Sequence, residues 1–189
     1  EPKYVCLRGL FYMWNIGTKK IKMNVFDLFL DAANKDDVVA QYFIGRCYEV
    51  GRSTKKDMKK AIKWYNKAID NGCAAAERIL GDYYFRNQSY SKAFKLLQSA
   101  TDKGNIMAMY NLGLCYKKGR GTGENMEKGF EYLKQAAEMG VPNSLRELAN
   151  CYEYGEGTAK DLNKASYWFR EADCYHARER VTAKIKDNL

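Results

Sequence analysis

Histidine and proline are both scarce in this chain of 189 residues, which contains one histidine and two prolines. The single histidine, His176, cannot build a histidine-based metal cage or an H-E-x-x-H motif, and no catalytic constellation surrounds it in the sequence. With so little proline, and with abundant Ala, Leu, Lys and Glu, the composition favours helices over short strands. We therefore expect a helical protein that is not an enzyme, with no catalytic residue, no metal ligand and no cofactor.

Long apolar runs and nucleotide-binding motifs are missing as well. The chain has no run of about eighteen apolar residues and no signal-peptide core, so we expect no membrane span. Neither G-x-x-x-x-G-K-[ST] nor G-x-G-x-x-G is present. The pattern S-x-x-K begins at Ser53 and at Ser89, but the Ser-Asp-Asn and Lys-Thr-Gly of penicillin-recognising enzymes do not accompany it. No class of enzyme is favoured by these patterns.

Acidic residues are outnumbered by basic ones, and the net charge is +9. The densest basic cluster comprises Arg52, Lys55, Lys56, Lys59, Lys60, Lys63 and Lys67. A repeat protein that reads RNA would present a comparable contact in every unit, and this cluster is not repeated. We interpret the excess charge as a solvated exterior and do not expect a nucleic-acid partner, with RNA binding and an acidic partner as the alternatives.

One pattern recurs along the whole chain, a small residue followed three positions later by a tyrosine. The period is 36 residues, with a single step of 32. The small residues are Gly9, Gly45, Gly81, Gly113 and Ala149, and the tyrosines are Tyr12, Tyr48, Tyr84, Tyr116 and Tyr152. A self-similar period of this length is typical of a solenoid, and a solenoid usually presents a binding surface.

The sequence pattern predicts two helices joined by a short loop in each unit. Between Val38 and Val50, Ala40, Ile44 and Tyr48 fall on one face of a helix. Glycines in the loop then end this helix, because glycine tolerates the positive φ of a C-cap. The second helices start after residues that make good N-caps, which are Asp57, Ser89, Asn125 and Asp161. They are closed by Gly72, Gly104 and Gly140, with His176 at the fourth such place.

A second small residue sits sixteen positions after the first in most units, as Gly129 does after Gly113. Because neither glycine has a side chain, the two helices of a unit can approach closely where they cross. A helix pair this short cannot bury its apolar stripe alone, so its stability must come from stacking on neighbouring units.

The stretch from Ala108 to Gly140 resembles the Sel-1-like repeats, a family related to the tetratricopeptide repeats. The family pattern is roughly A-x-x-x-L-G-x-x-Y-x-x-G-x-G-V-x-x-D-x-x-K-A-x-x-W-Y-x-x-A-A-x-x-G. It is matched by Ala108, Leu112, Gly113, Tyr116, Gly119, Gly121, Lys128, Tyr132, Ala136, Ala137 and Gly140. The chain departs from it at Asn15, at Ile21 and in the short loop Asn87–Gln88. The resemblance implies a right-handed αα superhelix that serves as an adaptor or scaffold, without enzymatic activity.

Six cysteines would permit disulfides, which some secreted members of the resembled family contain. However, Cys47, Cys115 and Cys151 occupy one equivalent repeat position. Equivalent residues of stacked units lie on the order of 10 Å apart, which is beyond disulfide reach. We therefore expect six free thiols and favour the cytoplasm, with a secreted or periplasmic location as the alternative if a leader has been removed.

Together these features predict an all-α solenoid of about five helix-turn-helix repeats in one domain, residues 1–189. The expected units span residues 3–36, 37–72, 73–104, 105–140 and 141–176, followed by a polar capping helix over residues 177–189. The expected function is a non-enzymatic protein–protein interaction scaffold. A secreted or periplasmic bacterial effector or immunity-type binding protein is the alternative within this class.

The resemblance implies that the first helices line a concave face, which we expect to bind a partner protein or peptide. The residues expected on that face, opposite the packing stripe, are Tyr42, Arg46 and Glu49; Arg78, Asp82 and Phe85; Tyr110, Leu114 and Lys117; and Arg146, Asn150 and Glu153. Tyrosine and arginine are over-represented in this set, and both types dominate binding hot spots.

Overall fold

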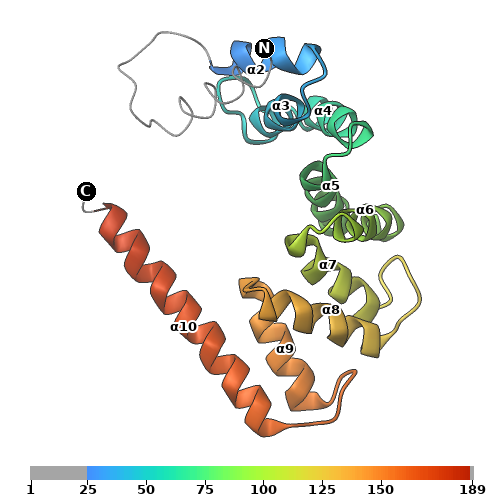
Figure 1. The fold of residues 1–189 in the computed structure, drawn as a ribbon, viewed down its shortest axis with the longest axis vertical. Helices are drawn as coiled ribbons and strands as arrows, with labels where there is room; N and C mark the ends of the chain where they lie inside the picture. Colours follow the sequence, from blue (N-terminus) through green and yellow to red (C-terminus); the bar gives the residue numbers. More distant parts are fainter. Residues whose placement is uncertain (1–24, 188–189) are drawn as a thin grey trace. The chain divides into compact units, whose positions relative to one another are not determined.

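The structure, a computed structural model, describes residues 25–187, and side chains from Phe26 to Tyr175. All regular structure in this range is α-helical (Figure 1). The helices are α2 (Val25–Asn34), α3 (Val38–Val50), α4 (Met58–Asp70), α5 (Ala74–Arg86), α6 (Tyr90–Asp102), α7 (Ile106–Lys117), α8 (Met126–Glu138), α9 (Pro142–Tyr154) and α10 (Leu162–Asp187). The predicted all-α repeat fold is confirmed. The predictions at Cys6, Gly9, Tyr12, Asn15 and Ile21 lie outside the described residues.

The chain divides into two compact units, one up to Leu80 and one from Gly81 onward. In the first unit, Phe29, Ala33, Ala40 and Ile44 are fully or almost fully buried in one cluster. In the second unit, clusters of buried Ala, Leu and Cys side chains lie between successive helices from α6 to α10. Each unit therefore has an apolar core of its own.

Three of the four predicted N-caps make the expected hydrogen bonds. The Oδ1 atoms of Asp57 and Asn125 accept the amides of the residues three positions on, at 3.0 and 2.8 Å. Asp161 Oδ1 accepts hydrogen bonds from the backbone amides of Asn163 and Lys164. These bonds, above all the one from Lys164, lower the pKa of the Asp161 carboxyl. Ser89 stands at the N-cap of α6 but its side chain makes no capping bond. With φ −82° and ψ 59°, its backbone departs from the extended geometry of the other caps.

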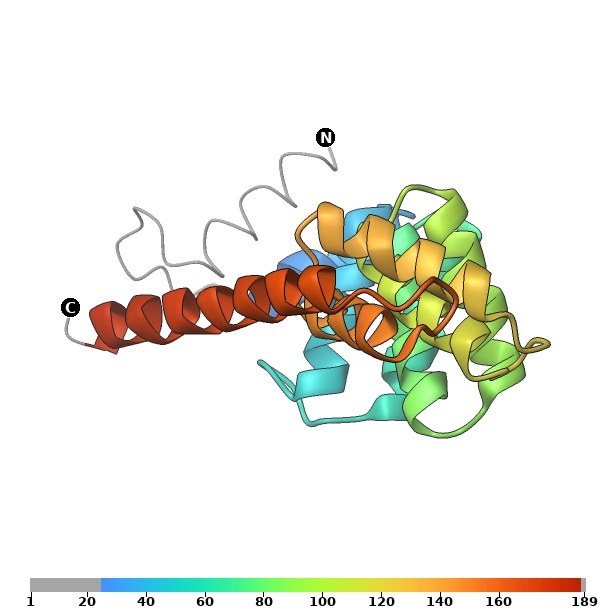
Figure 2. The same ribbon diagram turned by 90° about the horizontal axis from the view of Figure 1, so that it is seen from below.

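The last repeat differs from the prediction of a separate helix over residues 177–189. Instead, α10 continues without interruption from Leu162 to Asp187 (Figure 2). The three earlier closing glycines adopt positive φ, between 80° and 86°. Histidine stands at the equivalent fourth position, and an L-residue disfavours that left-handed geometry, so the helix has no residue that would end it there.

Gly113 and Gly129 mark the predicted close crossing of α7 and α8. A Cβ atom added at Gly129 would lie 2.9 Å from the backbone nitrogen of Lys117. One added at Gly113 would lie 2.9 Å from Leu133 Cγ and 3.1 Å from the carbonyl oxygen of Gly129. The two backbones therefore touch where the sequence places two residues without side chains.

A lysine–tyrosine contact recurs in every described repeat. The lysine is the third residue after the N-cap of the second helix, and its ammonium lies over the tyrosine ring of the first helix. The pairs are Lys60–Tyr48, Lys92–Tyr84, Lys128–Tyr116 and Lys164–Tyr152, at 5.4, 5.5, 5.5 and 5.3 Å from the ring centroids. Each pair ties the two helices of one repeat together through a cation–π attraction.

The five described cysteines are free thiols. Cys47, Cys115 and Cys151 are buried at equivalent positions, as expected for small core residues. Burial raises the pKa of all three thiols above the ordinary value, to about 11 for Cys115 and Cys151. These thiols therefore remain protonated and unreactive at neutral pH.

Candidate functional site

The predicted site residues of α3 form a hydrogen-bonded group with a tyrosine of α4. Glu49 Oε2 lies 3.3 Å from Arg46 Nη1 and accepts a hydrogen bond of 2.6 Å from the hydroxyl of Tyr65. Tyr65 is fully buried, and burial together with this bond raises the pKa of its hydroxyl far above the usual value. The half-buried Tyr42 ring lies 6.1 Å from the Tyr65 ring. One carboxylate oxygen of Glu49, Oε2, is therefore used inside the repeat.

The predicted residues of α5 fall on both sides of the division between the two units. Arg78, in the first unit, is half-buried. In the second unit, Asp82 accepts a hydrogen bond from the side-chain amide of Asn111 on α7. The half-buried Phe85 ring is covered by the guanidinium of Arg120, whose Cζ lies 5.1 Å from the centroid. Asp82 and Phe85 therefore already have partners within the repeat array.

Leu114 and Tyr110 of α7 lie at the core rather than on a free surface. Leu114 is 8% exposed and belongs to a cluster with Leu133 and Cys151. Tyr110 is half-buried against the same cluster, and burial, with the charge of Glu147, raises the pKa of its hydroxyl. The sequence predicts that Leu114 faces a partner, but its side chain is buried because it packs in a cluster with Leu133 of α8 and Cys151 of α9.

Lys117 is held in a nearly buried ion network. Its side chain is 10% exposed, and its Nζ lies 2.6 Å from Glu156 Oε2 and 3.3 Å from Glu147 Oε2. Burial opposes the charge, but the hydrogen bond from Lys117 to Glu156 and the nearby acidic groups raise the pKa of the ammonium. The network links α7, α9 and the loop after α9. It makes Lys117 a structural cation rather than a free contact.

The sequence contained a signal for this network that sequence reasoning did not use. Glu156 occupies the loop position where Arg52 and Arg120 stand in other repeats. A reversal of charge at one repeat position suggests a changed electrostatic environment. In the structure, that environment is the ammonium of Lys117 in the preceding repeat.

Arg146 of α9 is the one predicted site residue that is exposed. The side chains of Arg146 and Asp173 are 57% and 74% exposed, and Arg146 Nη2 lies 3.1 Å from Asp173 Oδ1. Such an exposed pair contributes little to stability, so a partner can displace it at small cost. Asn150 and Glu153 follow at i+4 and i+7 on the same helical face and are half-buried. We call Arg146, Asn150 and Glu153 the α9 row.

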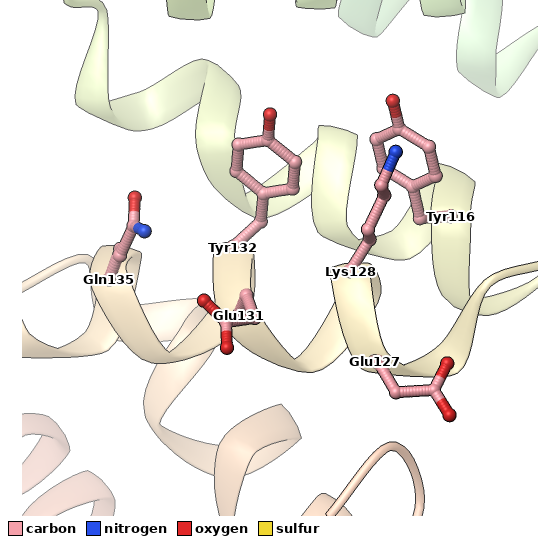
Figure 3. Close-up of a pocket in the computed structure, with 6 residues that line it drawn as sticks. All are labelled: Tyr116, Glu127, Lys128, Glu131, Tyr132 and Gln135. Carbon is pink, nitrogen blue, oxygen red and sulfur yellow. The ribbon is translucent and has the colours of Figure 1, made fainter.

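A groove that the sequence did not predict lies between side chains of α7 and α8 in the second unit (Figure 3). It has a volume of about 540 Å³ and is lined by Tyr116, Glu127, Lys128, Glu131, Tyr132 and Gln135. Tyr116 and Tyr132 stack with centroids 5.7 Å apart, and both rings project beside Lys128 (Figure 3). The Tyr116 hydroxyl bonds to Gln98 Oε1 at 3.4 Å. The only sequence signal for this groove was the tyrosine that recurs in every repeat. Because that tyrosine also packs against the core, its recurrence did not distinguish a groove from packing.

Metal sites and membrane spans are both absent from the part of the chain that the structure describes. No cluster of three or more His, Cys, Asp or Glu suitable for a metal ion occurs among them. Within the same part of the chain, every helix is too short or too polar to cross a lipid bilayer.

The sequence model of the Sel1 repeat matches the chain four times, over residues 38–73, 74–105, 106–141 and 142–172. These matches cover more than half of the chain, and their bounds follow the helix pairs α3–α4, α5–α6, α7–α8 and α9–α10. Sel1 repeats typically mediate protein–protein interaction and are generally non-catalytic.

Similar proteins were found among curated sequences and solved structures. DAP3-binding cell death enhancer 1 of Mus musculus is 31% identical over 59% of this chain and 30% of its own length. HRD3, an ERAD-associated E3 ubiquitin-protein ligase component of Candida glabrata, is 39% identical over 32% of this chain and 7% of its own length. A Sel1 repeat protein from Oxalobacter formigenes superimposes with a TM-score of 0.85 and 28% identity, over 93% of this chain and 71% of that protein. The chain spans less than a third of the curated relatives it matches.

Proposed function

The chain belongs to the Sel1 repeat family, and from this we propose that it is a non-enzymatic adaptor that binds a protein or peptide against its first helices. Two relatives are named for the complexes they join, one as a DAP3-binding protein and one as a ubiquitin-ligase component. Both names describe association with another protein. This supports the same class of function for the present chain.

The observation that carries the proposal is the exposed Arg146 at the start of the α9 row. Arg146 extends into solvent with a weak and exposed ion partner, and Asn150 and Glu153 continue the same face. An arginine fork with amide and carboxylate neighbours suits a peptide that presents both charged groups and backbone amides. Within the second unit, the proposed contact set is centred on this row and extends to the half-buried Tyr110, whereas Leu114 and Lys117 support it from within.

A site-specific photo-crosslinker tests the proposal. Placed at Asn150, in the middle of the α9 row, it should yield a discrete adduct with one or a few proteins from the native source. The matched control is the same crosslinker at Lys95, an exposed position on α6. Equal adducts from both positions, or from Lys95 alone, would contradict binding at the first helices.

A further inference from the structure

The exposed surface of α4 and of the loop before it is strongly basic. We define the α4 basic face as Arg52, Lys55, Lys56, Lys59, Lys60, Lys63 and Lys67, all of which are exposed. We propose that this face is a second interaction surface that binds an acidic polypeptide segment. It lies in the first unit, and the argument for it does not depend on the α9 row.

The cations of this face have no carboxylate partners in the described part of the chain. None of them lies in an ion pair there, whereas Lys117, Arg146 and Lys134 of the second unit each do. Asp57, an acidic residue within the cluster, already caps α4 by accepting the amide of Lys60. Among the described residues, therefore, no ion pair compensates the positive charge of the face.

The arrangement of these lysines is unfavourable for the helix that contains them. Lys59 and Lys60 stand in the first turn of α4, where the helix dipole favours acidic residues, and no acidic residue is present in that turn. Lys59, Lys63 and Lys67 repeat at i and i+4, which places like charges next to one another.

One equivalent helix of the second unit, α8, shows that the repeat does not require this arrangement. Its first turn contains Glu127, and Lys134 pairs with Glu138 at i+4 with a separation of 4.0 Å. The fold thus tolerates a favourable charge pattern at the same place. A first turn without an acidic residue also occurs in α6 and α10. The ladder of Lys59, Lys63 and Lys67 has no counterpart in the other second helices, and an external anion explains it.

The spacing of the lysines indicates which anion fits. Residues at i and i+4 of a helix are about 6 Å apart along the axis. Glutamates at the same spacing on a partner helix, or alternate acidic residues of an extended strand at about 6.6 Å, match this ladder. Trp64 lies beside it, half-buried, with Lys67 Nζ 4.4 Å from its ring centroid, and offers apolar contact to the partner. RNA recognition would call for several stacking aromatics, and α4 exposes only part of this single ring.

Fluorescence anisotropy with a labelled probe tests the proposal on the whole chain. The probe is a 20-residue alanine-rich peptide with glutamate at every fourth position, and its glutamine counterpart serves as the uncharged control. At about 150 mM salt the screening length is about 8 Å, so lysines far from the bound probe contribute little. We expect Lys59→Gln/Lys63→Gln/Lys67→Gln to weaken binding of the acidic probe at least tenfold while the far-UV circular dichroism stays unchanged.

The matched control removes the same charge elsewhere, by Lys95→Gln/Lys118→Gln/Lys160→Gln at three exposed positions. This variant should change affinity less than threefold, as should Arg146→Ala/Asn150→Ala in the α9 row. Equal losses in both lysine variants would mean that only net charge acts, and the proposal would be wrong. Tighter binding of an oligouridylate or of anionic vesicles than of the acidic peptide would likewise overturn it, in favour of nucleic acid or of a membrane surface.

Discussion

At the scale of single residues, the contact between Gly113 and Gly129 is the clearest link between sequence and packing. The backbone of each helix occupies the space that a side chain of the other would need. In the two preceding repeats the first-helix glycine is retained, and a side chain of the second helix lies where a Cβ would be, Tyr65 for Gly45 and Leu97 for Gly81. In the last repeat the small residue is Ala149. The small residue is thus a condition for pairing the two helices.

We therefore predict that Gly113→Leu destabilises the second unit by about 1 to 3 kcal/mol, because the added side chain must displace Leu133 or separate α7 from α8. Lys118 lies five residues after Gly113 and its side chain is exposed, so Lys118→Leu should change the free energy of unfolding by less than about 0.5 kcal/mol. Urea denaturation of both variants measures the difference. Indistinguishable midpoints would remove the packing role of Gly113.

The buried thiols lead to a prediction about alkaline pH. Burial raises the pKa of Cys115 and Cys151 to about 11, above the ordinary value of about 8.5 in an unfolded chain. As pH rises, the unfolded chain releases these protons first, so their contribution to stability is full below about pH 8.5 and is lost toward pH 11. We expect the unfolding free energy of wild type to fall more steeply between pH 8 and pH 10 than that of Cys115→Ala/Cys151→Ala. Parallel pH profiles would contradict this.

At the scale of helices, the repeat pattern predicted where each element begins and ends, because caps and closing glycines depend on local geometry. Asp57, Asn125 and Asp161 act as expected. Ser89 does not, because the loop before α6 is short and holds its backbone in another conformation. The continuous α10 was also missed, since a helix without a terminating residue simply continues into a polar sequence.

The caps can be compared by mutation. Asn125→Ala should cost about 1 kcal/mol, because it leaves the amide of Lys128 without its side-chain acceptor. Ser89→Ala should cost much less, since its hydroxyl makes no such bond. Thermal unfolding of the two variants provides the comparison. A larger shift for Ser89→Ala than for Asn125→Ala would show that the assigned capping bonds do not determine helix stability.

At the scale of the whole molecule, the sequence predicted the family and the repeat fold more completely than the surface. Tyr110, Leu114 and Lys117 were chosen by helical position alone, and the structure buries much of each. Helical position identifies the side of α7 on which a residue lies, but not whether α9 covers it. Ion partners such as Glu147 and Glu156 come from other repeats and are invisible to a pattern within one repeat.

The central claim is that the chain holds a partner protein through its first helices. Its most direct test is the affinity of the crosslinked and identified partner for wild type and for Arg146→Ala/Asn150→Ala, measured by isothermal titration calorimetry. We expect a loss of about 2 kcal/mol or more, close to thirtyfold, because exposed arginine and its neighbours form the proposed hot spot. Lys95→Ala/Lys118→Ala should bind as wild type does. Unchanged affinity in the α9 variant would contradict the account.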